Sequence, residues 1–216
     1  GSVSDSETIT VNQAPSASNL SVSQPDYCAS GPAAFFSWTF NDPGDSQSAY
    51  QVQADNNSNF SSPEDDSGKV SSGGQNYATP LGKLSYGNTY FWRLTVWDSK
   101  DLASSWISGS SFATPAHAYP GIDFSWIPFN PSQDEQTQFT DQSSVFGGST
   151  KSAWSWTFQS GDPSSSSQQN PITKFTSSGS KTITLRVTDS SGFACEGSKT
   201  LSAQLPLPEW KEIAPF

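Results

Sequence analysis

The sequence predicts an all-β protein built from two β-sandwich domains in tandem, and three observations support that prediction. First, the 216 residues are only 32% hydrophobic and 14% charged, against about 45–50% and about 25% in an average domain, so the residues that favour helices are scarce. Second, 13% of the chain is aromatic, with 16 Gly and 15 Pro, which favours short strands joined by turns. Third, a Pro-bounded stretch at residues 114–121 divides the chain near its middle, and no apolar period of 3.6 residues persists in either half.

These boundaries predict two domains of about 100 residues, the usual size of a β-sandwich. The predicted domains are residues 15–114 and 122–203, joined by a linker at residues 115–121. Residues 1–14 are expected to be a scar and leader segment, because Gly1-Ser2 is typical of an expression tag and the chain has no Met. Residues 204–216 are expected to be a Pro-rich tail. We therefore expect a fragment, or a mature chain without its signal peptide.

The first half contains short runs of alternating polarity between clusters of turn residues. In the strongest of them, Tyr90, Trp92, Leu94 and Val96 lie on one predicted face. The expected strands are residues 19–23, 34–40, 49–54, 69–71, 76–79, 89–97 and 105–113.

The second half repeats this pattern. Trp154, Trp156 and Phe158 alternate along one run, and a hairpin turn is predicted at residues 189–192. The expected strands are residues 122–126, 137–141, 153–158, 172–175, 181–188 and 193–202.

Composition and charge also exclude several functions. The net charge of −10 predicts no nucleic-acid partner, which would need a basic surface. No run of about 18 apolar residues exists, so we expect no membrane insertion by this segment. With one His and two Cys, zinc sites built from those residues are excluded, and a Ser-His-Asp site would have to use His117, which we interpret as a linker residue.

Two family resemblances emerge from particular residues. The run Leu-Ser-Tyr-Gly-Asn-Thr-Tyr at residues 84–90, followed by the alternating strand, resembles the corner before the sixth strand of fibronectin type III domains. Trp38 would be the core tryptophan, and Tyr90 the corner tyrosine whose hydroxyl bonds to nearby backbone.

Residues 121–203 resemble a PKD (polycystic kidney disease) domain in the order and spacing of its motifs. The matching pieces are Phe-Thr-Asp-Gln-Ser at residues 139–143, Trp-Ser-Trp-Thr-Phe at 154–158, Asn170-Pro171 and the run from Gly179 to Gly192. The sequence departs from the family pattern at Thr157, at Lys181 and in the turn at residues 158–162. The fold class is therefore expected to be two tandem immunoglobulin-like, seven-stranded β-sandwiches.

The resemblance implies an extracellular or cell-surface location and a non-enzymatic role as a spacer or adhesion module of a bacterial surface or secreted protein. The partners would be other domains of the same polypeptide, together with a surface polysaccharide or another surface protein. An accessory module of a secreted hydrolase, binding carbohydrate or protein, is the alternative. Fold alone does not decide between them.

The two cysteines are expected to form an interdomain disulfide. In a seven-stranded sandwich, the first-to-second turn shares a pole with the end of the last strand, so Cys28 would face the linker. By the same reasoning, Cys195 follows the sixth-to-seventh turn of the second domain and also faces the linker. The alternative is a pair of free, partly buried thiols.

The turn Asp42-Pro43-Gly44-Asp45 admits two interpretations. It resembles acidic turns that bind calcium in secreted modules, where carboxylates and carbonyls supply the oxygen ligands. It is also a good plain turn. No other cofactor is expected. Residues 64–66 and 134–135 are interpreted as solvated loop charges, and no pair of acids suggests glycoside cleavage.

Aromatic residues on the outer face of the 89–97 strand are candidates for ligand binding. Phe91 and Trp97 are out of phase with the buried set and would form a sticky patch on that face. The alternative is that a loop, the linker or the tail covers them. Trp38, Trp92 and Trp156 fall on predicted core faces and are expected to pack inside.

Overall fold

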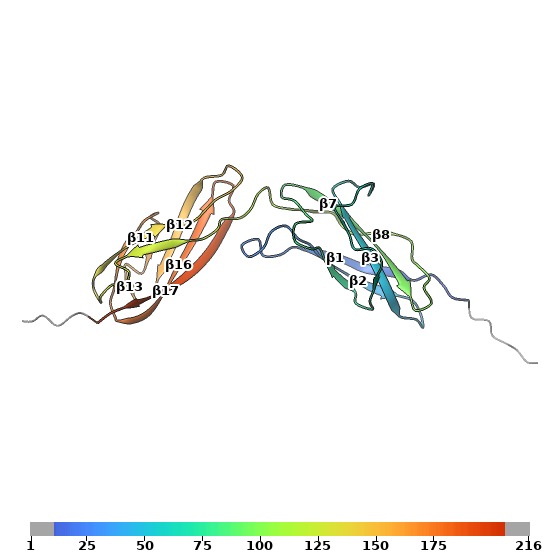
Figure 1. Ribbon diagram of the computed structural model, residues 1–216, viewed down its shortest axis with the longest axis horizontal. Coiled ribbons are helices and arrows are strands. Elements are labelled where there is room, and N and C mark those ends of the chain that lie inside the picture. The colour runs from blue at the N-terminus through green and yellow to red at the C-terminus, as the bar shows by residue number, and fades with distance from the viewer. Residues whose placement is uncertain (1–10, 206–216) are drawn as a thin grey trace, which may run out of the picture. The chain divides into compact units, whose positions relative to one another are not determined.

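A computed structural model describes residues 11–205 of the chain, which divides after Ala116 into two units. The described residues form strands and connecting loops without a helix (Figure 1). None of them belongs to a helix that could cross a membrane. The all-β prediction is confirmed. The start of the leader and most of the tail, including Trp210, lie outside the described residues.

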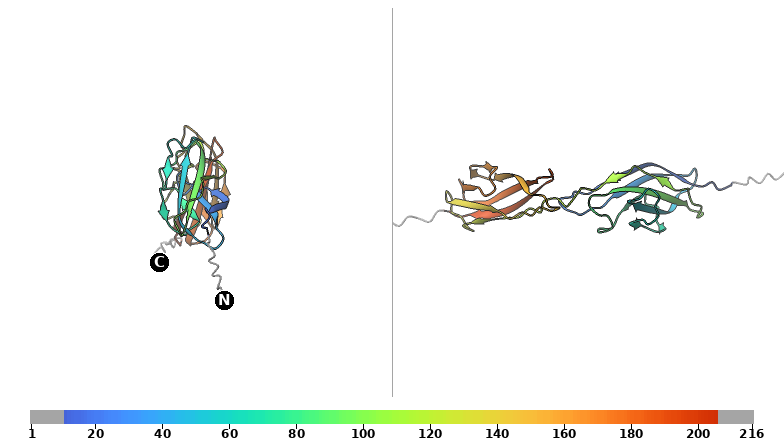
Figure 2. Two further views of the ribbon diagram at one scale, coloured as in Figure 1. Left: turned by 90° about the vertical axis from the view of Figure 1, so that its right-hand side faces the viewer. Right: turned by 90° about the horizontal axis from the view of Figure 1, so that it is seen from above.

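The first unit consists of two antiparallel sheets, which the views in Figure 2 show as layers. One sheet has the order β1-β2-β6 and the other the order β4-β3-β7-β8, with β5 also pairing with β3 and β9 with β7. The strands are β1 (Ser16–Ser23), β2 (Phe35–Asn41), β3 (Gln47–Asp55), β4 (Asp65–Asp66), β5 (Val70–Ser71), β6 (Asn76–Ala78), β7 (Thr89–Asp98), β8 (Ile107–Ser108) and β9 (Phe112–Ala113). Since β4 and β5 form one broken edge, and β8 and β9 another, this is a seven-stranded sandwich.

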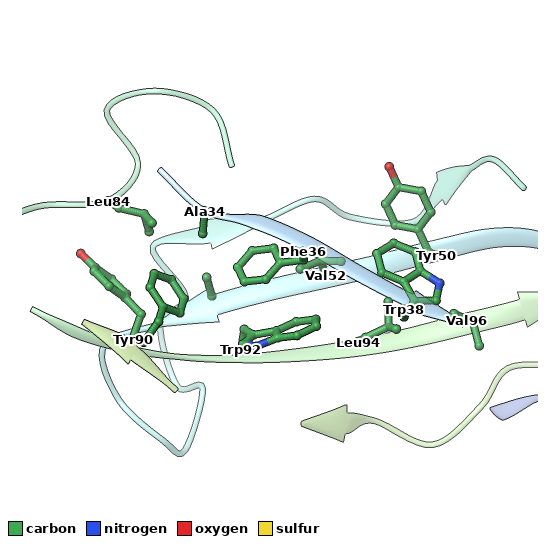
Figure 3. Packing of buried hydrophobic residues seen from close by; sticks show 12 residues of the cluster. Ala34, Phe36, Trp38, Tyr50, Val52, Leu84, Tyr90, Trp92, Leu94 and Val96 are labelled. Atoms are coloured by element: carbon green, nitrogen blue, oxygen red, sulfur yellow. The ribbon is translucent and has the colours of Figure 1, made fainter. Parts of the chain in front are cut away.

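The alternating side chains of β7 enter the core of the first unit as predicted. Trp92, Leu94 and Val96 are fully buried. The rings of Trp92 and Phe36 stack with centroids 4.4 Å apart, bringing β7 against β2 (Figure 3). The hydroxyl oxygen of Tyr90 accepts a hydrogen bond from the backbone N–H of Ser85 at 2.8 Å, which confirms the expected tyrosine corner.

The second unit has one sheet in the order β10-β11-β15-β13 and another in the order β14-β12-β16-β17. Its strands are β10 (Phe124–Ile127), β11 (Gln136–Asp141), β12 (Lys151–Phe158), β13 (Gly161–Asp162), β14 (Ser165–Ser166), β15 (Ile172–Phe175), β16 (Gly179–Asp189) and β17 (Ala194–Ala203). Trp156, Phe158 and Leu185 are buried between the sheets with Phe139. Counting β13 and β14 as one strand that changes sheet again gives seven.

The structure departs from the predicted elements at the sheet edges. Residues 105–113, expected as one strand, are divided into β8 and β9. The carbonyl of Ser110 turns inward to accept the indole N–H of Trp92 at 3.1 Å, and a Cβ at Gly109 would collide with that indole. The core tryptophan therefore interrupts the edge strand.

One acidic residue expected in a solvated loop is instead buried. Asp65 is 2% exposed on β4 and accepts a hydrogen bond from the Tyr77 hydroxyl at 3.0 Å. Burial raises the pKa of the Asp65 carboxyl, opposed by this hydrogen bond. The expectation for Asp65 was wrong because the pairing of β4 with β3 carries it inward.

Candidate functional site

Three aspartates from two distant segments converge beside the turn at residues 42–45. The backbone N–H of Asp45 donates to the carbonyl of Asp42 at 3.3 Å, and Gly44 takes a positive φ of 84°, so the turn is well defined. The pairing of Gln47 with Asp98 places the end of β7 next to this turn. Carboxylate oxygens of Asp42, Asp45 and Asp98 all lie within 4.8 Å of one another.

Asp98 is fully buried and holds the loop that follows β7. Its Oδ1 accepts hydrogen bonds from the backbone N–H groups of Lys100 at 2.9 Å and Leu102 at 2.8 Å, and its Oδ2 accepts from the Asn12 amide at 2.6 Å. Burial alone would raise the pKa of Asp98, but these donors lower it overall. Asp98 is therefore a carboxylate held in its charged form.

Asp45 is the carboxylate that the chain's own cation contacts. The Lys100 ammonium lies 3.0 Å from Asp45 Oδ2 and 3.1 Å from the side-chain oxygen of Asn12. Hydrogen bonds from the Ser99 side chain, the Ser46 backbone and Lys100 hold the pKa of Asp45 well below its usual range. Among these groups, one ammonium faces three carboxylates.

Asp42 completes the group without a partner for one of its oxygens. Its Oδ2 is buried and has no hydrogen-bond partner, the one such side-chain atom in residues 11–205. A buried carboxylate oxygen without a donor is costly. A cavity of about 390 Å³ adjoins it, lined by Asp42, Asp45, Lys100, Asn12 and their neighbours.

Sequence reasoning identified Asp42 and Asp45 but missed Asp98. The available signal was the Trp97-Asp98 end of the strongest strand. In an antiparallel pair, the end of one strand lies beside the start of the other. Had the 89–97 strand been paired with the strand that follows the turn, Asp98 would have been expected there.

Phe91 and Trp97 are half-buried on the outer face of β7, and the structure does not bring them into one patch. They are six residues apart, about 20 Å along a strand. Between them, the Arg93 guanidinium lies over the rings of Phe60 at 4.3 Å and Trp106 at 4.4 Å. Ligand binding by Phe91 and Trp97 stays a prediction.

His117 is anchored within the second unit. Its Nε2 lies 3.1 Å from Ser191 Oγ and 3.8 Å from Asp189 Oδ2, while Nδ1 faces the carbonyl of Ala118 at 2.8 Å. In a catalytic triad, the serine and the aspartate bind opposite ring nitrogens. Here both approach the same nitrogen, so the contacts fit an anchoring role.

Cys28 and Cys195 are both disulfide-bonded, and residues 11–205 contain no free cysteine. Peptide mapping without reduction would test the predicted pairing directly. A disulfide is typical of proteins that fold in an oxidising compartment.

Both units are β-sandwich modules of the immunoglobulin-like class. Residues 29–116 match the family model described as "Rha78A-like, N-terminal immunoglobulin domain", and residues 117–204 match the model described as "PKD domain". The chain thus contains an immunoglobulin-like domain followed by a PKD domain, which confirms the predicted tandem and assigns the fibronectin-like half to the Rha78A-like model. Modules of these kinds are typically non-catalytic and resemble accessory modules of rhamnosidase-type proteins.

Three solved structures illustrate the similarity. The PKD1 domain of Vibrio anguillarum Epp is 20% identical, covering 42% of this chain and 99% of its own, with a TM-score of 0.36. The fibronectin(III)-like modules of Clostridium thermocellum CbhA are 12% identical, covering 86% and 93%, with a TM-score of 0.36. The α-L-rhamnosidase of Streptomyces avermitilis is 21% identical with a TM-score of 0.40; the match covers 87% of this chain but 24% of the rhamnosidase. No curated protein matches this chain closely enough to count as a relative.

Proposed function

We propose that this segment is a non-enzymatic extracellular module of a bacterial surface or secreted protein, acting as a folded spacer beside other domains of the same polypeptide. The observation that carries the proposal is that each unit has a complete aromatic core of its own. Trp38 and Trp92 belong to the core of the first unit, and Trp156 belongs to that of the second. Modules with separate cores can hold neighbouring domains apart without a partner of their own. The disulfide-bonded cysteines support an extracellular location.

A replacement experiment in the full-length protein tests the spacer role. Residues 11–205 would be exchanged either for two unrelated β-sandwich domains of similar size or for a Gly/Ser linker of equal length. Because a flexible linker behaves as a coil while folded domains do not, we expect the folded replacement to preserve the activity or adhesion of the neighbouring domains and the linker to reduce it. Equal loss with both replacements would contradict the spacer role and favour a binding role.

A second candidate function is that of a carbohydrate- or protein-binding accessory module. The observation that favours it is a group of exposed apolar side chains on one sheet of the PKD domain, including Ile127 and Phe129. Patches of this kind on soluble domains mark interaction sites.

The convergence of Asp42, Asp45 and Asp98 supports binding of calcium in the first domain. Calcium takes six to eight oxygen ligands at about 2.3–2.6 Å, so two oxygens on one ion lie at most about 5 Å apart. The spacing of the three carboxylates meets this limit. The orphaned oxygen of Asp42 is the atom that a cation would satisfy.

Calcium is expected to raise the melting temperature of the first domain, with a dissociation constant of about 10⁻⁴–10⁻³ M, typical of extracellular modules. Asp42→Asn should abolish that increase, yet without calcium it should be at least as stable as wild type, because it relieves carboxylate repulsion. Lys100→Gln should tighten binding, since the ammonium competes with the ion. Calorimetry with calcium and with chelator measures all three effects.

Asp101→Asn is the matched control, because Asp101 lies in the same loop but pairs with Lys69 outside the cluster. It should leave the calcium response unchanged. If wild type and Asp42→Asn respond alike to calcium, the turn is a plain turn.

A further inference from the structure

The outer face of the sheet β10-β11-β15-β13 carries large apolar side chains that no other part of the described chain covers. Ile127 is 69% exposed, Phe129 is 73% exposed and Ile172 is 48% exposed. The strand register pairs Ile127 with Gln138, and Gln138 with Ile172. Side chains at paired positions lie on the same face of a sheet, so these three residues form one row across three strands.

Two cavities follow this row and join into one trough. One, of about 420 Å³, is lined by Ile127, Pro128, Gln136, Gln138 and Ile172. The other, of about 240 Å³, is lined by Gln136, Asp162, Pro163, Ile172, Thr173 and Lys174. Because they share Gln136 and Ile172, the trough runs from β10 to β13. This is three strand spacings, or about 14 Å.

The apolar end of the trough is held in place before any ligand arrives. The rings of Trp126 and Phe129 stack with centroids 6.0 Å apart and planes 4° from parallel. The indole N–H of Trp126 also donates to the carbonyl of Phe129 at 3.0 Å. One face of the Phe129 ring is thereby fixed against Trp126 while the side chain stays largely exposed. Such preorganisation lowers the entropy cost of binding.

The polar lining indicates an uncharged ligand. The Lys174 ammonium lies 3.6 Å from Asp162 Oδ2, so the two charges compensate each other. The Gln138 amide donates to the backbone carbonyls of Phe139, Asn170 and Pro171, which fixes a side chain whose oxygen can still accept. The chain's net charge of −10 disfavours polyanions.

We propose that this trough binds a neutral polysaccharide; the inference rests on the accessory-module alternative of the proposed function. Apolar side chains would contact the C–H faces of the sugar rings, and the amides of Gln136 and Gln138 would bond their hydroxyls, the mixture typical of ligand sites. A peptide strand is less suited to this face, because strand addition uses free backbone groups at a sheet edge. Those of β11 and β15 are already paired with their neighbours.

Affinity electrophoresis of the two-domain chain tests the inference. The probes are a soluble β-glucan, a galactomannan and an arabinoxylan, with polygalacturonate as the polyanion. We expect retardation by at least one neutral polymer. Phe129→Ala and Gln136→Ala should weaken it at least tenfold, while the melting temperature stays near that of wild type because both side chains are exposed. Phe146→Ala is the matched control, since Phe146 is 43% exposed in the same domain but does not line the trough.

Each other outcome overturns the inference in a distinguishable way. No retardation by any neutral polymer excludes it but leaves the spacer role intact. Retardation lost in Trp97→Ala and kept in Phe129→Ala would retain the accessory function but move the site to the first domain. Dimerisation of the free chain that Phe129→Ala abolishes would make the trough a contact between copies.

Discussion

Trp92→Ala is expected to destabilise the first domain by about 3–5 kcal/mol, the usual cost of removing a large buried aromatic side chain. Trp92 has no exposed surface and stacks on Phe36. Its indole N–H also satisfies the carbonyl of Ser110. The variant therefore loses packing and leaves a buried acceptor without its donor.

The same substitution should leave the second domain unchanged, because the two cores share no residue. Calorimetry of the two-domain chain would show one transition moving to lower temperature and one staying in place. Trp156→Ala should give the mirror result. Leu81→Ala, at a position 71% exposed, should change stability by less than about 0.5 kcal/mol. Two transitions that shift together in Trp92→Ala would contradict the autonomy on which the spacer role depends.

The long strands could be predicted because their signal is local. An alternation of period two places Trp92, Leu94 and Val96 on one face whatever the neighbours are. In β16, Ile183, Leu185 and Val187 follow the same rule and are all buried. Core positions within these strands therefore follow from the sequence alone.

The short edge strands could not be predicted, because their residues are typical of turns. β4 is Asp65-Asp66 and β14 is Ser165-Ser166, compositions that disfavour strands. Their partners impose the extended conformation: Asp66 pairs with Gln53, and its carboxylate accepts hydrogen bonds from the amides of Gln51 and Gln53. Tertiary pairing decides what local propensity does not.

Candidate sites divide in the same way. The turn at residues 42–45 is contiguous, so its two acids could be recognised together, whereas Asp98 joins them only through the β3–β7 register. Likewise, Ile127 and Ile172 are 45 positions apart and meet across β11. Neither site has a sequence signature until strand pairing is known.

Asp141→Ala is expected to destabilise the second domain by about 3–5 kcal/mol, because it removes one partner of a buried ion pair. The Asp141 carboxylate is inaccessible and accepts from the Lys151 ammonium at 2.6 Å and the Trp154 indole at 2.8 Å, both through Oδ2. Its Oδ1 accepts from the backbone N–H of Ser143 at 2.8 Å. Truncation leaves a partly buried ammonium and an indole N–H without their acceptor.

The pH dependence of stability isolates the charge of Asp141. Burial alone would raise its pKa, but the hydrogen bonds from Lys151, Trp154 and Ser143 lower it overall. A carboxyl whose pKa is lower in the folded state stabilises the fold above its unfolded pKa of about 3.9, and that contribution is lost as the pH falls through the folded value. Melting of the second domain should therefore fall more steeply below about pH 5 in wild type than in Asp141→Asn. Asp134→Asn, at an exposed position, should keep the wild-type slope. A slope in Asp141→Asn equal to that of wild type would show that other carboxylates carry the acid sensitivity of this domain.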